Sequence, residues 1–384
     1  MEVLGQLGGA ATGLLGYIVP FLVVLTVVVF VHELGHFLVG RWCGVGVTSF
    51  SIGFGPELLG FNDRHGTRWK LSAIPLGGYV KFFGDTNGAS VPDQDAIAQM
   101  TPEERRRGFH TQPVWKRAAI VAAGPVANFL LAIALFGGVI YVAGRLEVPP
   151  RVETVNPGSA AERAGFQPGD VILSIDGRSV SSFADMQRIV SASAGEPLGF
   201  TVDRGGARTQ VGAVPDVIVE KTPFGQHRIG RLGLQGPRDA ADAKLVRYGL
   251  ADSLTHGSRE TWFVVERTFD YLGKLITGRE SADQLSGPIG IARVSGQVAK
   301  VGGAGALVGL VAVLSVSIGL INLFPVPLLD GGHLLFYAVE VLRGRPLSDR
   351  AQEIGFRIGL ALVLALMLFA TWNDLVHSWA ARGT

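Results

Sequence analysis

The stretch VVVFVHELGHF, residues 27–37, decides how the rest of the sequence is interpreted. It closes a long apolar run with three ionisable side chains, His32, Glu33 and His36. Ionisable groups are costly in hydrocarbon and are rare within membrane-spanning segments. One interpretation is that the run has reached water and these residues form its polar end. The other is that the three side chains carry out metal chemistry inside the membrane.

The composition is that of a membrane protein with a soluble part. Of the 384 residues, 48% are hydrophobic and only 17% are charged, which is more apolar than an ordinary soluble domain needs. The formal net charge of +2 gives no support for a nucleic-acid partner. The single cysteine, Cys43, excludes an internal disulfide framework and a cysteine-only zinc site. Any metal must therefore be held by histidines and carboxylates.

Four apolar segments are long enough to cross about 30 Å of hydrocarbon as helices. They cover approximately residues 17–39, 118–142, 301–324 and 354–372. Basic residues are concentrated in the loops after the first and third segments, and the positive-inside rule places those loops in the cytoplasm. Both termini and the stretch from about 145 to 300 are then expected on the outer side. The first segment lacks a basic n-region, so it is expected to remain in the mature protein.

The long outer stretch changes character and predicts a small α+β domain at about 147–220. A strand-like VILSI runs into Asp176-Gly177, which is a strong hairpin signal, and a second strand turns at Gly205-Gly206. From 240 to about 278, a helical pattern mixes aromatic and charged residues. This pattern is compatible with an interfacial amphipathic helix and equally with a helix packed on the soluble domain.

Residues 32–36 form an HExxH motif, which places two imidazoles one turn apart on the same face of a helix. Both can reach one zinc ion, while Glu33 lies close enough to take a proton from a metal-bound water. Catalytic zinc usually has three protein ligands, so one is missing. The candidates follow the third apolar segment in INLFPVPLLDGGH, where Asp330 and His333 are both possible on spacing alone. Zinc suits this ligand set, although iron or cobalt could occupy the same groups.

Several tracts together resemble the bacterial site-2 proteases, the RseP-like intramembrane zinc metalloproteases. They are HELGH, GFGPEL, IPLGGYVKFFGD, AGPVANFLLA and NLFPVPLLDGG, with NPGSAAERAGFQPGDVILSIDG resembling one bacterial PDZ domain. The resemblance covers roughly residues 17–375. It implies His32, His36 and Asp330 as Zn²⁺ ligands and Glu33 as the catalytic base. It also implies that Asn322 positions substrate or stabilises the oxyanion, for which the alternative is a structural hydrogen bond between helices.

The tract from Val45 to Gly84 reads as short strands separated by glycine turns. In the family such strands dip into the membrane beside the zinc and pair with substrate. Gly77 and Gly78 would allow close backbone approach, and with Tyr79 they are the predicted substrate-binding residues. The alternative is a cytoplasmic hairpin that serves only stability.

The predicted fold class is a polytopic α-helical membrane protein with four transmembrane helices, a membrane-associated β-hairpin region and an inserted α+β PDZ-like domain. The expected divisions are a first transmembrane helix (1–43), a β region and loop (44–115), a second transmembrane helix (116–144), a periplasmic PDZ-like domain (145–236), an amphipathic interfacial region (237–300), a third transmembrane helix (301–330), a cytoplasmic loop (331–353), and a fourth transmembrane helix with its tail (354–384).

The expected activity is regulated intramembrane proteolysis in the bacterial inner membrane, with the active site near the cytoplasmic side. The family suggests single-pass substrates such as anti-sigma factors or remnant signal peptides, already trimmed by an upstream site-1 type protease. The expected partners are these substrates, that protease and the lipid bilayer, and no nucleic acid. Two rival interpretations are a catalytically silent PDZ membrane adaptor and a metal transporter. Intact Glu33 argues against the adaptor. The lack of charged residues near the centres of the second and fourth spans argues against the transporter.

Overall fold

The computed structural model describes residues 2–88, 93–222, 225–237, 243–279, 282 and 286–380. The parts of the predicted divisions that fall elsewhere, including the end of the C-terminal tail, lie outside the described residues. Two compact units are present. The membrane unit comprises residues 1–139, 254–268 and 287–372, and the insert unit comprises residues 140–253, 269–286 and 373–384.

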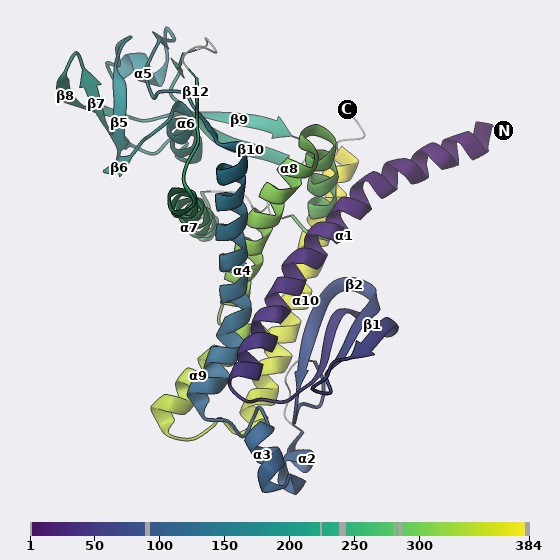
Figure 1. The fold of residues 1–384 in the computed structure, drawn as a ribbon. Helices are drawn as coiled ribbons and strands as arrows, with labels where there is room; N and C mark the ends of the chain where they lie inside the picture. The colour runs from purple at the N-terminus through teal and green to yellow at the C-terminus, as the bar shows by residue number, and fades with distance from the viewer. Residues whose placement is uncertain are drawn as a thin grey trace. The chain divides into compact units, whose positions relative to one another are not determined.

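Four helices of the described chain are long and apolar enough to cross a membrane, and this confirms the prediction of a multi-pass membrane protein. They are α1 (Glu2–Trp42), α4 (Val114–Ala143), α8 (Pro288–Asn322) and α10 (Asp349–Ala380). Within the membrane unit α1, α4 and α8 run side by side (Figure 1). Buried Val24 and Val28 of α1 and Val311 of α8 pack together, with Leu131 of α4 against them.

Two boundaries around the third span differ from those predicted. Helix α8 begins at Pro288, a favoured first helical residue, whereas hydropathy alone placed the start at 301. Near that point Gly303 adopts φ 61° and ψ −156°, which breaks the regular helix. The segment 331–353, predicted as a loop, contains helix α9 (Asp330–Arg343). Gly331-Gly332 gave a turn signal there, but the apolar residues after it repeat at helical spacing and bury Tyr337.

The tract after α1 forms an antiparallel pair of long strands, β1 (Val47–Asn62) and β2 (Arg68–Phe82). Ser49 pairs with Lys81 on one side and with Arg68 on the other, so the hairpin folds back on itself around the first half of β1. Arg41 at the end of α1 donates a hydrogen bond of 2.6 Å to Asp63 in the hairpin turn. The returning half of the hairpin is therefore fastened to the helix that carries HExxH.

Two short helices complete this region, which was predicted only as strands and loop. Helix α2 (Gln94–Gln99) is capped by Asp93, whose side chain accepts from the Ala96 amide. Helix α3 (Pro102–Arg107) begins with a capping box in which Thr101 and Glu104 bond reciprocally.

The insert unit is built around a four-stranded sheet in the order β6-β5-β7-β8. Its turns form as the sequence predicts: Asp176 and Gly177 both have positive φ between β5 and β6, as a two-residue hairpin loop requires. Phe200, Ile172 and Ile175 are fully buried in its core. The elements are β3 (Arg145–Glu147), β4 (Thr154–Val155), α5 (Ala160–Arg163), β5 (Val171–Ile175), β6 (Arg178–Ser179), α6 (Phe183–Ala192), β7 (Leu198–Arg204), β8 (Ala207–Ala213), β9 (Asp216–Thr222), β10 (Gly225–Arg231), β11 (Leu234–Gln235) and β12 (Lys244–Val246).

The predicted helical region 240–278 is wrong at its start. Residues Lys244–Val246 form β12, which pairs with β3 at the beginning of the insert. Helix α7 covers Leu250–Ile276 and contributes to both units. Its part in the membrane unit packs on α4, where a Cβ on Gly257 would lie 2.5 Å from the Ile133 carbonyl oxygen.

Candidate metal centre

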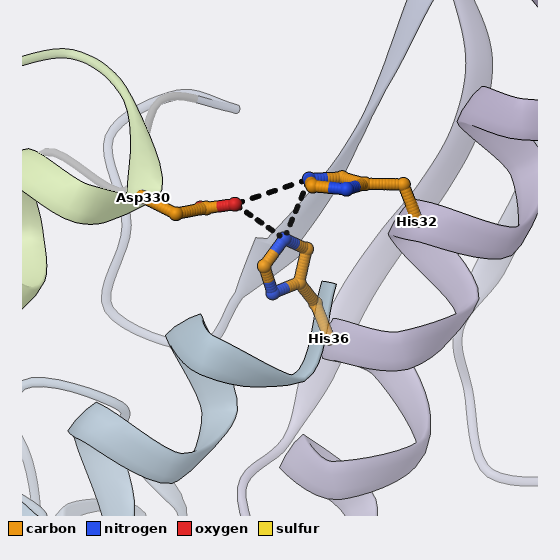
Figure 2. A group of neighbouring side chains, drawn as sticks. All are labelled: His32, His36 and Asp330. Atoms are coloured by element: carbon orange, nitrogen blue, oxygen red, sulfur yellow. Dashed lines mark hydrogen bonds and ion pairs between the residues drawn. The ribbon is translucent and has the colours of Figure 1, made fainter. Parts of the chain in front are cut away.

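His32 and His36 lie on consecutive turns of α1 and are both buried, with 8% and 9% of their surface exposed. Their Nε2 atoms are 3.2 Å apart. Figure 2 shows the two imidazoles converging from one side on the carboxylate of Asp330. The helical spacing that the motif predicts is therefore realised as a pair of ligand atoms directed at one point.

Asp330 is the first residue of α9 and approaches from the opposite side. Its Oδ2 atom lies 3.1 Å from His32 Nε2 and 3.5 Å from His36 Nε2. The turn that delivers it is tight: a Cβ on Gly331 would lie 2.3 Å from the Leu323 carbonyl oxygen. Leu328 has φ 94°, which is rare for a residue with a side chain. The sequence between α8 and α9 thus holds a strained backbone that places one carboxylate.

These three residues fit a zinc ion. Ligand atoms bound at about 2.1 Å in tetrahedral geometry lie about 3.4 Å apart, close to the separations of 3.1–3.5 Å found among the three atoms. Asp330 Oδ2 is buried and faces the two imidazole nitrogens, and within the described residues it forms no hydrogen bond of good geometry, as expected for an oxygen directed at a cation. In the described chain, His32, His36 and Asp330 are also the one group of three or more His, Cys, Asp and Glu side chains whose ligand atoms all lie within 4.8 Å of one another.

The charge state of Asp330 suits a ligand. Burial alone would raise its pKa, but the neighbouring His36 and His32 side chains outweigh burial and hold the pKa below its ordinary value. The carboxylate is therefore ionised at neutral pH. The rival ligand His333 lies on the next turn of α9 and lines the same cavity, but it stands outside the three-residue group. Burial lowers the pKa of His333, so its imidazole is neutral.

Each histidine also makes a contact through its Nδ1 atom, and the sequence motifs predict neither of these two contacts. His36 Nδ1 lies 2.9 Å from the Ile120 carbonyl oxygen, and His32 Nδ1 lies 3.2 Å from Asn128 Nδ2. Both partners come from α4. A backbone carbonyl leaves no trace in a motif, but Asn128 belongs to the tract AGPVANFLLA, which carried part of the family resemblance.

Helix α4 approaches the histidines closely because Gly124 has no side chain. A Cβ on Gly124 would lie 2.3 Å from His36 Nε2 and 2.9 Å from His32 Cε1. In return, a Cβ on Gly35 of α1 would lie 2.3 Å from the Ala123 carbonyl oxygen. These two glycines are therefore needed for close helix packing beside the ligand atoms.

A cavity of about 180 Å³ opens beside the three ligands. Glu33 lines it, and the main chain of Val80 forms a hydrogen bond to this carboxylate. Asn322, the last residue of α8, lines it as well. The predicted base and the predicted oxyanion residue therefore share one cavity with the ligands. No hydrogen bond of the Asn322 side chain is found within the described part of the chain, which gives no support to its alternative role as a link between helices.

Two of the three predicted substrate-binding residues line the cavity. Gly78 and Tyr79 line the cavity, and a Cβ on Gly78 would lie 3.0 Å from Glu33 Cγ. Gly77 does not line it. This residue has φ 139°, and a Cβ there would lie 2.4 Å from the Phe54 ring, so Gly77 shapes the strand.

One cavity gathers two histidines of an HExxH helix, a carboxylate and a neighbouring glutamate. This is the arrangement of a candidate metallopeptidase site in a multi-pass membrane protein. The chain belongs to peptidase family M50, whose model matches residues 20–366. This confirms the predicted membership of the site-2 protease family, and the protein is a zinc metalloendopeptidase of that family.

The relatives agree in size and description. A protein of Agrobacterium fabrum, "Putative zinc metalloprotease Atu1380", is 52% identical over 368 residues, which cover 95% of this chain and 97% of the relative. The metalloprotease MmpA of Caulobacter vibrioides is 43% identical and covers 94% of this chain and 96% of its own length. Among solved structures, the PDZ domain of the SdrC-like protein of Listeria monocytogenes matches with a TM-score of 0.19 and 18% identity, covering 23% of this chain and 87% of that domain.

Proposed function

We propose that the protein hydrolyses peptide bonds within transmembrane segments of single-pass membrane proteins, and so performs regulated intramembrane proteolysis. The observation that carries this proposal is the position of the cavity. It is lined by Glu33 and both histidines on the membrane-spanning helix α1, beside the strand residues Gly78 and Tyr79.

In this proposal His32, His36 and Asp330 hold the metal. A zinc ion held by these residues would supply Lewis acidity at the cavity. Glu33 then takes the proton of the attacking water and delivers it to the leaving nitrogen. The Val80 main chain hydrogen-bonds to the Glu33 carboxylate, and this contact orients the base toward the cavity.

Asn322 is proposed to stabilise the oxyanion. Its side chain lies at the end of α8 and lines the same cavity as His32 and His36. An amide N–H is a suitable donor to the negative charge that develops on the carbonyl oxygen. Because Asn322 has no other hydrogen bond in the described chain, its amide is available for this contact.

The outer edge of β2 is proposed to hold the substrate. Residues 78–82 pair with β1 on one side, and within the described chain no strand pairs with their other side. A transmembrane helix hides its carbonyls in its own hydrogen bonds, so it must be extended before hydrolysis. Adding the extended segment to a strand edge would satisfy its backbone next to Glu33.

The hairpin is proposed to lie in the membrane. It exposes an unusual number of large apolar side chains for a surface hairpin. These are Phe54, Leu58, Leu59, Phe61, Leu71, Ile74 and Leu76, which are between 39% and 69% exposed. Lipid would cover these side chains and keep the substrate strand at the depth of the metal site.

The insert unit is proposed to act as a filter on the periplasmic side of a bacterial inner membrane, admitting substrates that an upstream site-1 type protease has already trimmed. Anti-sigma factors and remnant signal peptides are the proposed substrate classes. Glu147 of β3 pairs with Lys244 of β12, so a short turn joining these residues can replace 148–243. If the shortened protein still rejected an untrimmed substrate, the filter proposal would be wrong.

The direct test compares the wild-type protein with Glu33→Gln on a tagged single-pass substrate in detergent, with fragments followed by mass spectrometry. We expect the variant to bind zinc normally and to cleave at least about 100-fold more slowly, because it lacks the general base. Glu353→Gln is the matched control, since Glu353 lies on α10 with 61% of its side chain exposed. Equal cleavage by wild type and Glu33→Gln would refute the assigned role.

A further inference from the structure

Asn128 is a polar residue of α4 that contacts the ligand His32 and is fully buried, with 0% of its surface exposed. Its Nδ2 atom lies 3.2 Å from His32 Nδ1, while its Oδ1 atom has no hydrogen-bond partner among the residues that the structure describes. A buried amide with an unpaired oxygen is destabilising. Helix packing alone does not explain an asparagine at this position, because leucine would pack between the helices as well.

The two histidines differ in the group that faces their Nδ1 atom. His36 Nδ1 faces the carbonyl oxygen of Ile120, which can only accept. Nδ1 of His36 therefore carries the hydrogen, and its Nε2 lone pair is directed at the ligand cluster. His32 Nδ1 faces the Asn128 amide instead. An amide presents an acceptor and a donor from the same position, so the orientation of Asn128 decides which nitrogen of His32 carries the hydrogen.

We infer that Asn128 is a positioning residue that prepares His32 to bind the metal. A half turn of its amide exchanges Oδ1 and Nδ2 with little change of shape. Oδ1 then accepts a hydrogen bond from His32 Nδ1, and the Nε2 lone pair is free to face Asp330 and His36. Metal-binding histidines almost always donate their other N–H to such a partner, which fixes the ring and strengthens the ligand.

The packing contacts of Asn128 are separable from this role. Its backbone carbonyl accepts a hydrogen bond of 2.9 Å from Ser315 Oγ of α8. A Cβ on Gly319 of α8 would lie 3.1 Å from the Asn128 Cβ. Both contacts use atoms that every side chain at position 128 retains. A change of the amide therefore removes the contact with His32 and preserves the junction of α4 and α8.

This inference rests on the proposed metal site, and zinc affinity tests the two separately. Full-length wild type and variants in detergent are titrated with zinc against a chelator of known affinity, and the Co²⁺-substituted forms are compared by visible absorption. We expect Asn128→Leu to bind zinc about 10- to 100-fold more weakly, with an altered cobalt spectrum. Asn128→Asp keeps the acceptor and is expected to bind zinc at least as tightly as the wild type. Ser315→Ala removes the α8 contact and is expected to match the wild type.

Three results would overturn the inference. These are wild-type affinity in Asn128→Leu, affinity in Asn128→Asp as weak as in Asn128→Leu, or an equal loss in Ser315→Ala. Should Asn128→Leu fail to fold, Asn128→Ala replaces it in the same comparison. A wild-type protein that binds no zinc would overturn the metal site and this inference together, whereas wild-type binding with no effect at position 128 would overturn this inference alone.

Discussion

The two units of the protein differ in the partners of their buried polar side chains. In the insert unit an apolar core from Val152 to Leu232 surrounds Phe200, and the buried carboxylate of Asp170 is paired with Arg204. In the membrane unit the helices expose residues such as Leu130 and Leu364, while His32, His36 and Asn128 are buried. Water drives the burial of apolar side chains in the insert unit. Lipid solvates apolar surface, so the membrane helices can expose their apolar side chains. The buried polar cluster of His32, His36 and Asn128 therefore marks the candidate site of the membrane unit, whereas buried Asp170 of the insert unit forms an ion pair with Arg204 beside the core.

The largest predicted effect is at a glycine of the membrane unit. In Gly124→Ala the new Cβ would lie 2.3 Å from His36 Nε2, so α4 must move away from the ligands. We expect cleavage to fall by about 100-fold or more, since a displacement of about 1 Å can cost this much, together with a loss of bound zinc. In Gly138→Ala on the same helix the new Cβ meets no atom of the described residues within 4 Å, so this variant should retain both properties. Normal zinc content in Gly124→Ala would contradict the close contact.

In the insert unit the strongest effect should be on stability. Phe200 is fully buried and packs edge-on against Phe166, with ring centroids 5.2 Å apart. Phe200→Ala is expected to destabilise the insert by about 3–5 kcal/mol through the cavity it leaves. Pulse proteolysis of the full chain in urea measures this, with the exposed Arg208→Ala as control. Zinc content should not change, and a loss of zinc would show that the two units are not independent in this respect.

A smaller effect is expected from acid. Burial would raise the pKa of Asp185, but hydrogen bonds from Ser181 and Arg188 and the charge of Arg145 lower it to about 2. A lowered pKa stabilises the fold above the unfolded value of 3.8, and this contribution, about 2 kcal/mol, is lost as the pH falls toward about 2. Asp185→Asn should remove this part of the pH dependence in pulse proteolysis. An unchanged acid profile in the variant would exclude Asp185 as its source.

The sequence predicts the local features of the structure better than its tertiary features. HExxH, the Asp176-Gly177 turn and the four spans depend on neighbours along the chain, so they were predictable. The Nδ1 contacts of the histidines with Ile120 and Asn128, and the close approach at Gly124, depend on how α4 packs on α1. No periodicity within one segment encodes such packing. Helix α9 was missed for a local reason, because Gly331-Gly332 signals a turn while serving as the close-packed start of a helix.

The strand region illustrates the same limit. Its alternating residues predicted strands, but the pairing of Ser49 with both Lys81 and Arg68 is a tertiary result. Gly78 and Tyr79 were selected for substrate binding and do line the cavity, whereas Gly77, selected on the same grounds, supports the strand against Phe54. Adjacent glycines can thus have different roles that only the folded arrangement distinguishes.

The most direct test of the metal site compares two variants on the same helix. Asp330→Ala and His333→Gln each remove one of the two candidates for the third ligand, which share α9 and the cavity. Zinc per chain is measured after purification, together with cleavage of the model substrate. We expect wild type and His333→Gln to hold one equivalent and to cleave, and Asp330→Ala to lose both properties. Full zinc and cleavage in Asp330→Ala, with loss in His333→Gln, would contradict the His32, His36 and Asp330 site.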